Sequence, residues 1–208
     1  MKIGVLALHG DVIEHIHATE AAAKNLCSNL FSNSQEFENK YSRIEIIEIR
    51  TKKDLRDLNA LIIPGGESTT LSMLCEREGM FGDMKKIKNI FGTCAGAILL
   101  AKKVRHAIPG QKTLGLMDIE VDRNAYGRQT ESFEKDIRTS FGNVHAIFIR
   151  APKIIKTGRD VRILAKDGKE TLACEERREN RFYMAATFHP ELTSTIFHEY
   201  FLKQVLSQ

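Results

Sequence analysis

The chain lacks the features that mark membrane, exported and nucleic-acid-binding proteins. None of its apolar runs approaches the roughly 20 residues that cross a bilayer, and no signal peptide is recognisable, so we expect no membrane or export role. The net charge is only +4, and no basic patch is interleaved with aromatic residues, which argues against nucleic-acid binding. Internal repeats, low-complexity tracts and linkers are also missing. The 208 residues, 42% of them apolar, are therefore predicted to form one domain, residues 1–208.

Metal-binding and disulfide patterns are missing as well. The four cysteines form neither a C-x-x-C pair nor a zinc-ligand spacing. Scattered thiols are typical of a reducing compartment, so we expect a cytoplasmic protein. His15 and His17 would diverge on a helix, and His198 has no companion that suggests ligation. No metal and no cofactor is predicted. The cysteines interpreted as small apolar residues are Cys27, Cys75 and Cys174.

One cysteine stands in a different setting, within the segment Phe91–Ala101. Cys94 lies between an apolar run that fits a strand and one that fits a helix, and small residues such as Ala95 and Gly96 follow it. A strand–turn–helix elbow raises a side chain above the sheet edge and directs a helix N-terminus at it, which stabilises an anionic thiolate. The elbow predicts a nucleophile. The alternative interpretation is an inert, buried cysteine.

A second chemical element lies near the other end of the chain. His189 follows the apolar strand pattern Phe182–Phe188, and Pro190 disfavours helix at His189. A histidine at a strand end can accept a thiol proton, and the nearby Glu191 can orient its ring. The segment alone is also compatible with an ordinary turn.

A third element is the glycine turn within Ala60–Thr70. An apolar strand runs into Pro64 and then into Gly65 and Gly66, after which the residues fit the first turn of a helix. Glycine lets a ligand approach the main chain, so Gly66 N–H and Ala95 N–H are candidates for an oxyanion hole. An ordinary strand-to-helix turn is the alternative.

Alternating apolar segments and helix signals in the first half predict an α/β fold. We expect a doubly wound, mostly parallel sheet flanked by helices, flavodoxin-like in architecture, with its site at the carboxyl ends of the strands. Few helix signals occur in the C-terminal half, so some antiparallel strands are expected there. The predicted strands are Lys2–Leu8, Arg43–Ile49, Ala60–Ile63, Asn89–Gly92, Leu116–Val121, Val144–Ile149, Val161–Lys166, Thr171–Glu175 and Arg181–Thr187. The predicted helices begin after a capping Asp11, cover Thr69–Arg77, run from Cys94 to about Lys103, and cover Ser194–Val205.

Together these segments resemble the class I, triad-type glutamine amidotransferases, and within them the glutaminase subunit of pyridoxal 5'-phosphate synthase. The resemblance extends from Ile3 to Leu192. It rests on these segments: Ile3–Asp11, His15–Ala18, PGGEST at 64–69, FGTCAG at 91–96, Asp122–Gln129, Phe148–Pro152 and Phe188–Leu192.

The resemblance implies roles for particular residues. Cys94 would be the nucleophile, His189 the general base and acid, and Glu191 the orienting carboxylate. The matches to the family's glutamine contacts are Gly66, Glu67, Ser68, Arg123, Ile149 and Arg150. An arginine suits the substrate carboxylate because its planar fork can bind both oxygens.

The implied reaction converts L-glutamine to L-glutamate and ammonia through a glutamyl thioester. The implied partner is a barrel-shaped synthase subunit that takes the ammonia for vitamin B6 synthesis. The resemblance further implies that the chain alone is weakly active, because docking would complete the oxyanion hole.

Two departures accompany the resemblance. His9 stands where the family usually has glutamine, and Cys27–Arg43 is longer than usual, which we interpret as an extended first helix and a solvent-facing loop. Two other readings stay open: a cysteine hydrolase or stress protein of similar architecture, and a non-catalytic interaction subunit with a relic site.

Overall fold

The computed structural model describes residues 1–30, 44–125 and 132–207. Twelve strands of the described chain form one curled, mixed sheet, and helices cover both of its faces. The strands are β1 (Lys2–Leu6), β2 (Glu45–Ile49), β3 (Ala60–Ile63), β4 (Asn89–Thr93), β5 (Ala101–Arg105), β6 (Met117–Asp122), β7 (Ser132–Thr139), β8 (Gly142–Ile149), β9 (Lys153–Thr157), β10 (Val161–Asp167), β11 (Glu170–Arg178) and β12 (Arg181–Ala186). The helices are α1 (Val12–Leu30), α3 (Ser68–Arg77), α4 (Phe81–Met84), α5 (Ala95–Leu100) and α6 (Ile196–Leu206), with 3-10 turns η1 (Lys52–Leu55) and η2 (Pro190–Leu192).

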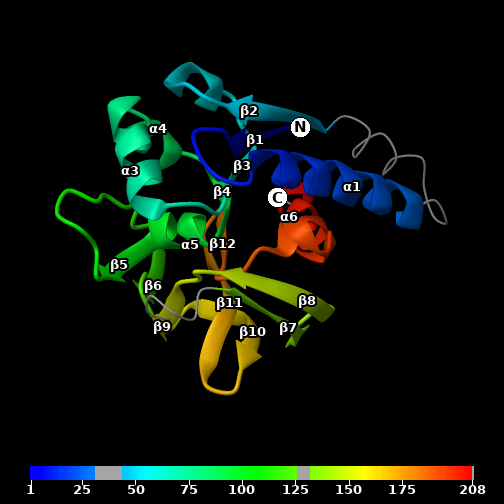
Figure 1. The fold of residues 1–208 in the computed structure, drawn as a ribbon. Helices are drawn as coiled ribbons and strands as arrows, with labels where there is room; N and C mark the ends of the chain where they lie inside the picture. Colours follow the sequence, from blue (N-terminus) through cyan, green and yellow to red (C-terminus); the bar gives the residue numbers. More distant parts are fainter. Residues whose placement is uncertain (31–43, 126–131, 208) are drawn as a thin grey trace.

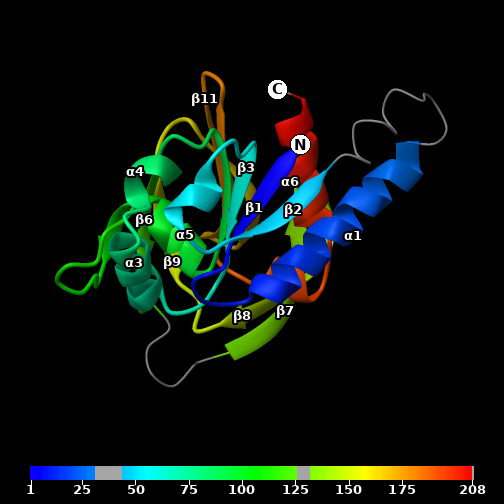
Figure 2. The same cartoon turned by 90° about the horizontal axis from the view of Figure 1, so that it is seen from above.

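The parallel part of the sheet has the strand order β2-β1-β3-β4-β12. Helices α1 and α6 lie on one side of it, and α3, α4 and α5 lie on the other, as both views show (Figures 1 and 2). Strand β3 is buried along its whole length, because both faces of a central parallel strand are covered. The predicted α/β fold with helices on both faces of a doubly wound sheet is thus confirmed, and the sheet as a whole is mixed.

Beyond β12 the sheet continues through the antiparallel strands β11, β10, β7 and β8. A smaller group, β5, β6 and β9, joins this part through β11. The sequence predicts antiparallel strands here but not β7 or β9. Strand β7 begins with five exposed residues, so it lacks the apolar alternation that reveals a strand.

Most predicted boundaries differ from the structure by a few residues, but at the end of the helix that follows Cys94 the type of element differs as well. We expected helix to about Lys103, but α5 ends at Leu100 and Ala101 begins β5. Pairing with β6, which places Ala101 opposite Met117, outweighs the local helix signal. Short apolar runs are ambiguous between helix and strand for this reason.

Two further sequence predictions fall partly outside the described residues. Helix α1 does extend past Cys27, to Leu30, as expected for a long first helix. The rest of the long segment, 31–43, and the motif residues 126–129 lie outside the described residues. Within the described ranges, we find no helix that is both long and apolar enough to cross a membrane.

Candidate active site

Cys94 occupies the sharp turn between β4 and α5. Its backbone has φ 47° and ψ −103°, a conformation that is strained for any residue except glycine and that is typical of nucleophile elbows. The backbone N–H of Cys94 donates to Ala186 O at 2.9 Å, which ties the turn to β12. A Cβ atom on Gly96 would lie 2.1 Å from Ile63 O, so only glycine lets α5 approach β3 this closely.

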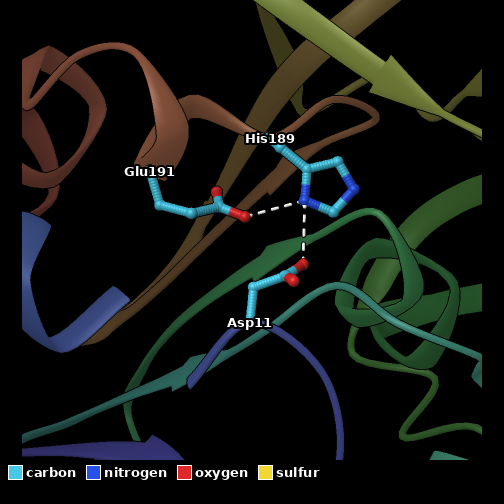
Figure 3. Close-up of side chains that lie close together, drawn as sticks. All are labelled: Asp11, His189 and Glu191. Atoms are coloured by element: carbon cyan, nitrogen blue, oxygen red, sulfur yellow. Dashed lines mark hydrogen bonds and ion pairs between the residues drawn. The ribbon is translucent and has the colours of Figure 1, made fainter. Parts of the chain in front are cut away.

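His189 follows β12 and is held by its backbone and by its ring. Its N–H donates to Ile147 O at 2.9 Å, and its Nδ1 lies 2.7 Å from Glu191 Oε1 (Figure 3). Pro190 begins the 3-10 turn η2, which brings Glu191 back toward the ring. Both side chains are almost completely buried, at 3% and 0% exposure.

A second carboxylate also reaches His189 Nδ1. Asp11 Oδ2 lies 3.1 Å from this nitrogen, and the Asp11 side chain is 37% exposed at the pocket mouth (Figure 3). The sequence interpretation treats Asp11 only as a helix cap. Gly10, which precedes Asp11, has φ +96° and packs against Gly65 O, where a Cβ would collide, so the turn that places Asp11 requires glycine at this position.

The electrostatics of His189 follow from these neighbours. Burial alone would lower the pKa of His189, but interactions with Asp11, the Cys94 thiol and Glu191 outweigh it and raise the pKa to about 12. The same hydrogen bond lowers the pKa of Asp11, whereas burial raises the pKa of Glu191. The imidazolium form of His189 is therefore favoured beside the thiol, ready to donate a proton.

The glycine turn packs directly against the histidine. A Cβ on Gly65 would lie 2.3 Å from His189 Cε1, so the turn needs glycine there, and Gly66 has φ +131°. Glu67 then caps α3 by accepting hydrogen bonds from Thr69 N at 3.0 Å and Thr70 N at 2.6 Å. Burial would raise the pKa of Glu67, but these hydrogen bonds dominate and lower it to about 2.

These groups surround a pocket of about 450 Å³, within the size range of small-molecule sites. The pocket contains Cys94 and His189 together with all six residues predicted to contact the substrate. Those six are Gly66, Glu67, Ser68, Arg123, Ile149 and Arg150. A larger hollow of about 600 Å³ lies over η1 but contains no cysteine or histidine, so we regard the Cys94 pocket as the site.

Arg123 is fixed in this pocket by two partners. Its guanidinium donates to Glu67 Oε1 at 3.0 Å and to Gln111 Oε1 at 3.2 Å. Gln111 in turn donates to Ser68 Oγ at 3.1 Å. Sequence reasoning missed Gln111, because a lone glutamine in a loop carries no pattern. Arg150 has φ 43°, and the neighbouring carbonyl of Ile149 accepts from Cys94 Sγ at 3.9 Å.

Ala95, the other predicted oxyanion-hole residue, is the first residue of α5, and so its N–H belongs to the helix end nearest the thiol. His9 also lines the pocket, close to Gly66. Asp11, His189 and Glu191 bring their ligand atoms within 4.8 Å of one another, which is close enough for a metal. Both carboxylates converge on one ring nitrogen, however, and that arrangement suits proton transfer and ring orientation.

Fold and pocket together define an α/β protein of the cysteine-elbow class, in which a thiol faces a histidine that is backed by carboxylates. Comparison with known proteins narrows this class. The chain belongs to the SNO glutamine amidotransferase family, whose model matches residues 5–207.

Individual relatives agree with the family assignment. The chain is 44% identical to "Pyridoxal 5'-phosphate synthase subunit PdxT" of Methanoregula boonei, with 99% of each chain covered. It is 41% identical to the protein of the same name from Pyrococcus horikoshii, over 99% of this chain and 100% of the relative. A solved structure described as a glutamine amidotransferase superposes with a TM-score of 0.78 at 39% identity, covering 98% of both chains.

Proposed function

We propose that this chain is the glutaminase subunit of a pyridoxal 5'-phosphate synthase and that residues 1–208 form one amidotransferase domain. It hydrolyses L-glutamine to L-glutamate and ammonia, and the ammonia passes to the synthase subunit. The observation that carries the proposal is a single pocket that contains Cys94 on a strained elbow and a buried His189 held by Glu191. Membership of the amidotransferase family supports the choice of glutamine as substrate.

The proposed mechanism begins with attack of the Cys94 thiolate on the side-chain amide carbon of glutamine. The oxyanion that forms accepts hydrogen bonds from the N–H groups of Gly66 and Ala95. His189, as the imidazolium, protonates the amide nitrogen, the C–N bond breaks, and ammonia leaves. Glu191 holds the ring so that the other ring nitrogen faces the reaction.

The second half of the reaction removes the acyl group. Neutral His189 takes a proton from water, the hydroxide formed attacks the glutamyl thioester, and the C–S bond breaks. Cys94 returns as thiolate, His189 is again protonated, and glutamate leaves. Glu67, Ser68, Arg123, Ile149 and Arg150 are proposed to bind the amino-acid part of the substrate.

The proposed partner is a barrel-shaped synthase subunit that docks over the pocket. Large apolar side chains are exposed near site residues: Ile149, which lines the pocket, is 38% exposed, and Ile13 and Leu192, which lie within two positions of Asp11 and Glu191 in the sequence, are 53% and 40% exposed. Apolar side chains of this kind at a pocket mouth are typical of an interface, and a docked partner would receive ammonia before water protonates it. We place the protein in the cytoplasm, and its free thiols Cys75, Cys94 and Cys174 support that choice.

The proposal is tested by measuring glutamate release from glutamine, with and without the synthase subunit. Release should increase when the synthase is present and should fall by roughly 10³-fold or more in Cys94→Ala. Cys75→Ala, which removes a thiol outside the pocket, serves as the control. Equal glutamate release by Cys94→Ala and its parent would overturn the assignment of Cys94 as the nucleophile. If both proteins stayed inactive with the partner present, the non-catalytic reading would be favoured.

A further inference from the structure

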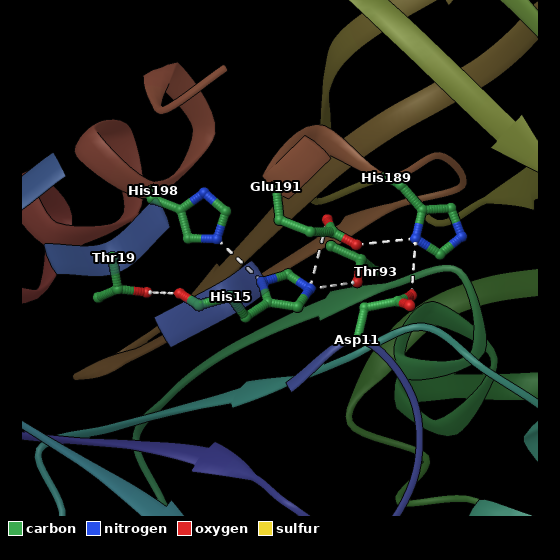
Figure 4. Close-up of polar contacts among 7 residues, drawn as sticks. All are labelled: Asp11, His15, Thr19, Thr93, His189, Glu191 and His198. Carbon is green, nitrogen blue, oxygen red and sulfur yellow. Dashed lines mark hydrogen bonds and ion pairs between the residues drawn. The ribbon is translucent and has the colours of Figure 1, made fainter. Parts of the chain in front are cut away.

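Behind Glu191 lies a pair of buried histidines that the proposed mechanism does not use. His15 of α1 and His198 of α6 are both 0% exposed, and His15 Nδ1 lies 2.9 Å from His198 Nε2 (Figure 4). The other nitrogen of His15, Nε2, lies 2.9 Å from Thr93 Oγ1 and 3.3 Å from Glu191 Oε2. Burying two imidazoles is costly unless their polar atoms are engaged, so this arrangement calls for an explanation.

Both rings are neutral at physiological pH. Burial lowers the pKa of His198 to about 3 and lowers the pKa of His15 well below its ordinary value. The groups that face His15 are Thr93 on β4, Glu191 on η2 and His198 on α6, with His189 and Asp11 beyond Glu191. The ring of Phe91 packs against His15 in a T-shaped arrangement, with the ring centroids 6.3 Å apart. Each neutral ring then carries one N–H group and one bare nitrogen.

The contacts fix which nitrogen carries the proton. A bare Nε2 on His15 would place a lone pair 3.3 Å from the carboxylate oxygen of Glu191, which is repulsive, so the proton belongs on Nε2. His15 Nδ1 is then an acceptor, and His198 must donate to it from Nε2. His198 Nδ1 is left without a proton, and it is the ring atom that lacks a hydrogen-bond partner among the described residues.

The result is a directional chain of donors. His198 donates to His15, and the His15 N–H points at Thr93 Oγ1 and toward Glu191 Oε2. The other oxygen of Glu191 accepts from His189 Nδ1 at 2.7 Å. The His15–Glu191 contact is a close electrostatic approach rather than an aligned hydrogen bond, because Glu191 Oε2 has no bond of acceptable geometry. The contact still places the partly positive hydrogen on His15 Nε2 near Glu191 Oε2, the carboxylate oxygen that is not bonded to His189.

We propose that His15 is a positioning residue for the glutaminase reaction: with His198 behind it, it holds the Glu191 carboxylate in the orientation that fixes the ring of His189. This inference rests on the proposed function for its kinetic test. His15 touches no reacting atom and does not line the pocket. Its removal should therefore lower kcat and leave KM nearly unchanged, as expected for a group that supports the acid–base residue.

Three substitutions at His15 separate positioning from packing. In His15→Gln the terminal amide reaches the level of Nε2 and can still donate toward Glu191. In His15→Asn the amide reaches only the level of Nδ1 and faces His198, and His15→Leu offers no polar atom. We expect kcat to fall roughly 10-fold to 100-fold in the Asn and Leu variants and to recover substantially in the Gln variant. His17→Leu, an exposed histidine one position past Ile16 on the same helix, is the matched control.

The outcome that would overturn the proposal is equal kcat in the Gln, Asn and Leu variants, or a rise in KM with kcat unchanged. Thermal unfolding of each variant shows whether a lost activity merely follows lost stability. A second measurement does not depend on turnover: nitrogen NMR of histidine-labelled protein, with His189→Gln to assign the signal, reports the Nδ1–H of His189.

The NMR signal should persist in the parent and in His15→Gln and should be lost or broadened in His15→Leu. A signal unaffected in His15→Leu would refute the positioning role. If instead the parent fails to release glutamate with its partner while the signal responds as expected, the proposed function fails and the positioning of His189 stands.

Discussion

The two carboxylates that meet His189 Nδ1 lie in opposite environments. Glu191 is fully buried, 2.7 Å from the ring, and is backed by His15 and His198 in the space between α1 and α6. Asp11 is 37% exposed, 3.1 Å from the ring, and stands at the mouth of the pocket. The comparison suggests two roles at one ring nitrogen: the buried carboxylate orients the His189 ring, and the exposed carboxylate adds to the stabilisation of its protonated form.

Burial decides how strongly each carboxylate acts. Water screens and weakens the interaction between Asp11 and the His189 ring. The interaction between Glu191 and the same ring takes place in a medium of low dielectric constant and is screened less. The walls of the two sides differ in the same way. On the Glu191 side Phe91 packs against His15 and His198, and Phe197 and Phe201 both pack against Phe91. On the Asp11 side the neighbours are the loop residues of the pocket.

Of the two carboxylates, the buried one should have the larger effect on activity when it loses its charge. Glu191→Gln keeps the shape of the side chain but removes the charge that supports the imidazolium form of His189. We expect kcat for glutamine hydrolysis to fall by roughly 10²-fold to 10⁴-fold, with a smaller change in KM. Steady-state kinetics of the complex with the synthase subunit checks this. A kcat equal to the parent's would remove Glu191 from the triad.

The open carboxylate should matter less. In Asp11→Asn we expect kcat/KM to fall by less than about 10-fold, because solvent already weakens this interaction. Loss of the hydrogen bond lowers the pKa of His189, so the decline of activity at alkaline pH should begin at a lower pH than in the parent. Glu14→Gln, which removes the same charge from an exposed residue nearby, is the control. A larger loss of activity in Asp11→Asn than in Glu191→Gln would contradict the expectation that the buried carboxylate matters more.

A third effect concerns the pH dependence of stability on the buried side. The pKa of His198 is about 3 in the folded protein and 6.5 in its ordinary state, so below pH 6.5 the unfolded chain binds a proton that the folded chain does not. The contribution of neutral, buried His198 to the free energy of unfolding is therefore fully present above pH 6.5 and is lost as the pH falls toward 3. His198→Phe should reduce the slope of unfolding free energy against pH by about 1.4 kcal/mol per pH unit in this window.

Urea unfolding at several pH values between these limits measures that slope. Groups that do not interact with His198 cancel in the difference between parent and variant, and His15 stays neutral in both because burial is the main cause of its lowered pKa, so the difference reports the proton of His198. Identical slopes would mean that His198 is protonated while buried, and the donor chain through His15 would have to be redrawn.

Whether a feature of the fold or of the site can be predicted from the sequence depends on how far apart in the chain its interacting residues lie. The strand Ala60–Ile63 was predicted to the residue, because a buried parallel strand appears as a continuous apolar run between turn signals. The elbow at Cys94 is also recognisable, since a strand-like apolar run, small residues and a helix-like apolar run follow one another in the sequence. Both features are encoded within a few residues.

Several of the missed features depend on partners distant in the sequence. Asp11 meets a histidine from the opposite end of the chain, and His15 meets His198 across 183 positions. Strand β5 was mistaken for helix because its pairing with β6 decides its conformation. Local patterns carry no information about such pairings, so the second carboxylate and the histidine pair became visible only in the fold.

The central claim is that Cys94 is the nucleophile of a glutamine site, and covalent labelling tests it most directly. A glutamine analogue that carries an electrophile in place of the side-chain amide should form one adduct, and peptide mass spectrometry identifies the cysteine. We predict labelling of Cys94 alone, prevented by excess glutamine, because burial raises the pKa of Cys75 to about 12 and also raises that of Cys174, and because Cys27 does not line the pocket that would bind the analogue. Labelling at another cysteine, or labelling that glutamine does not prevent, would contradict the account.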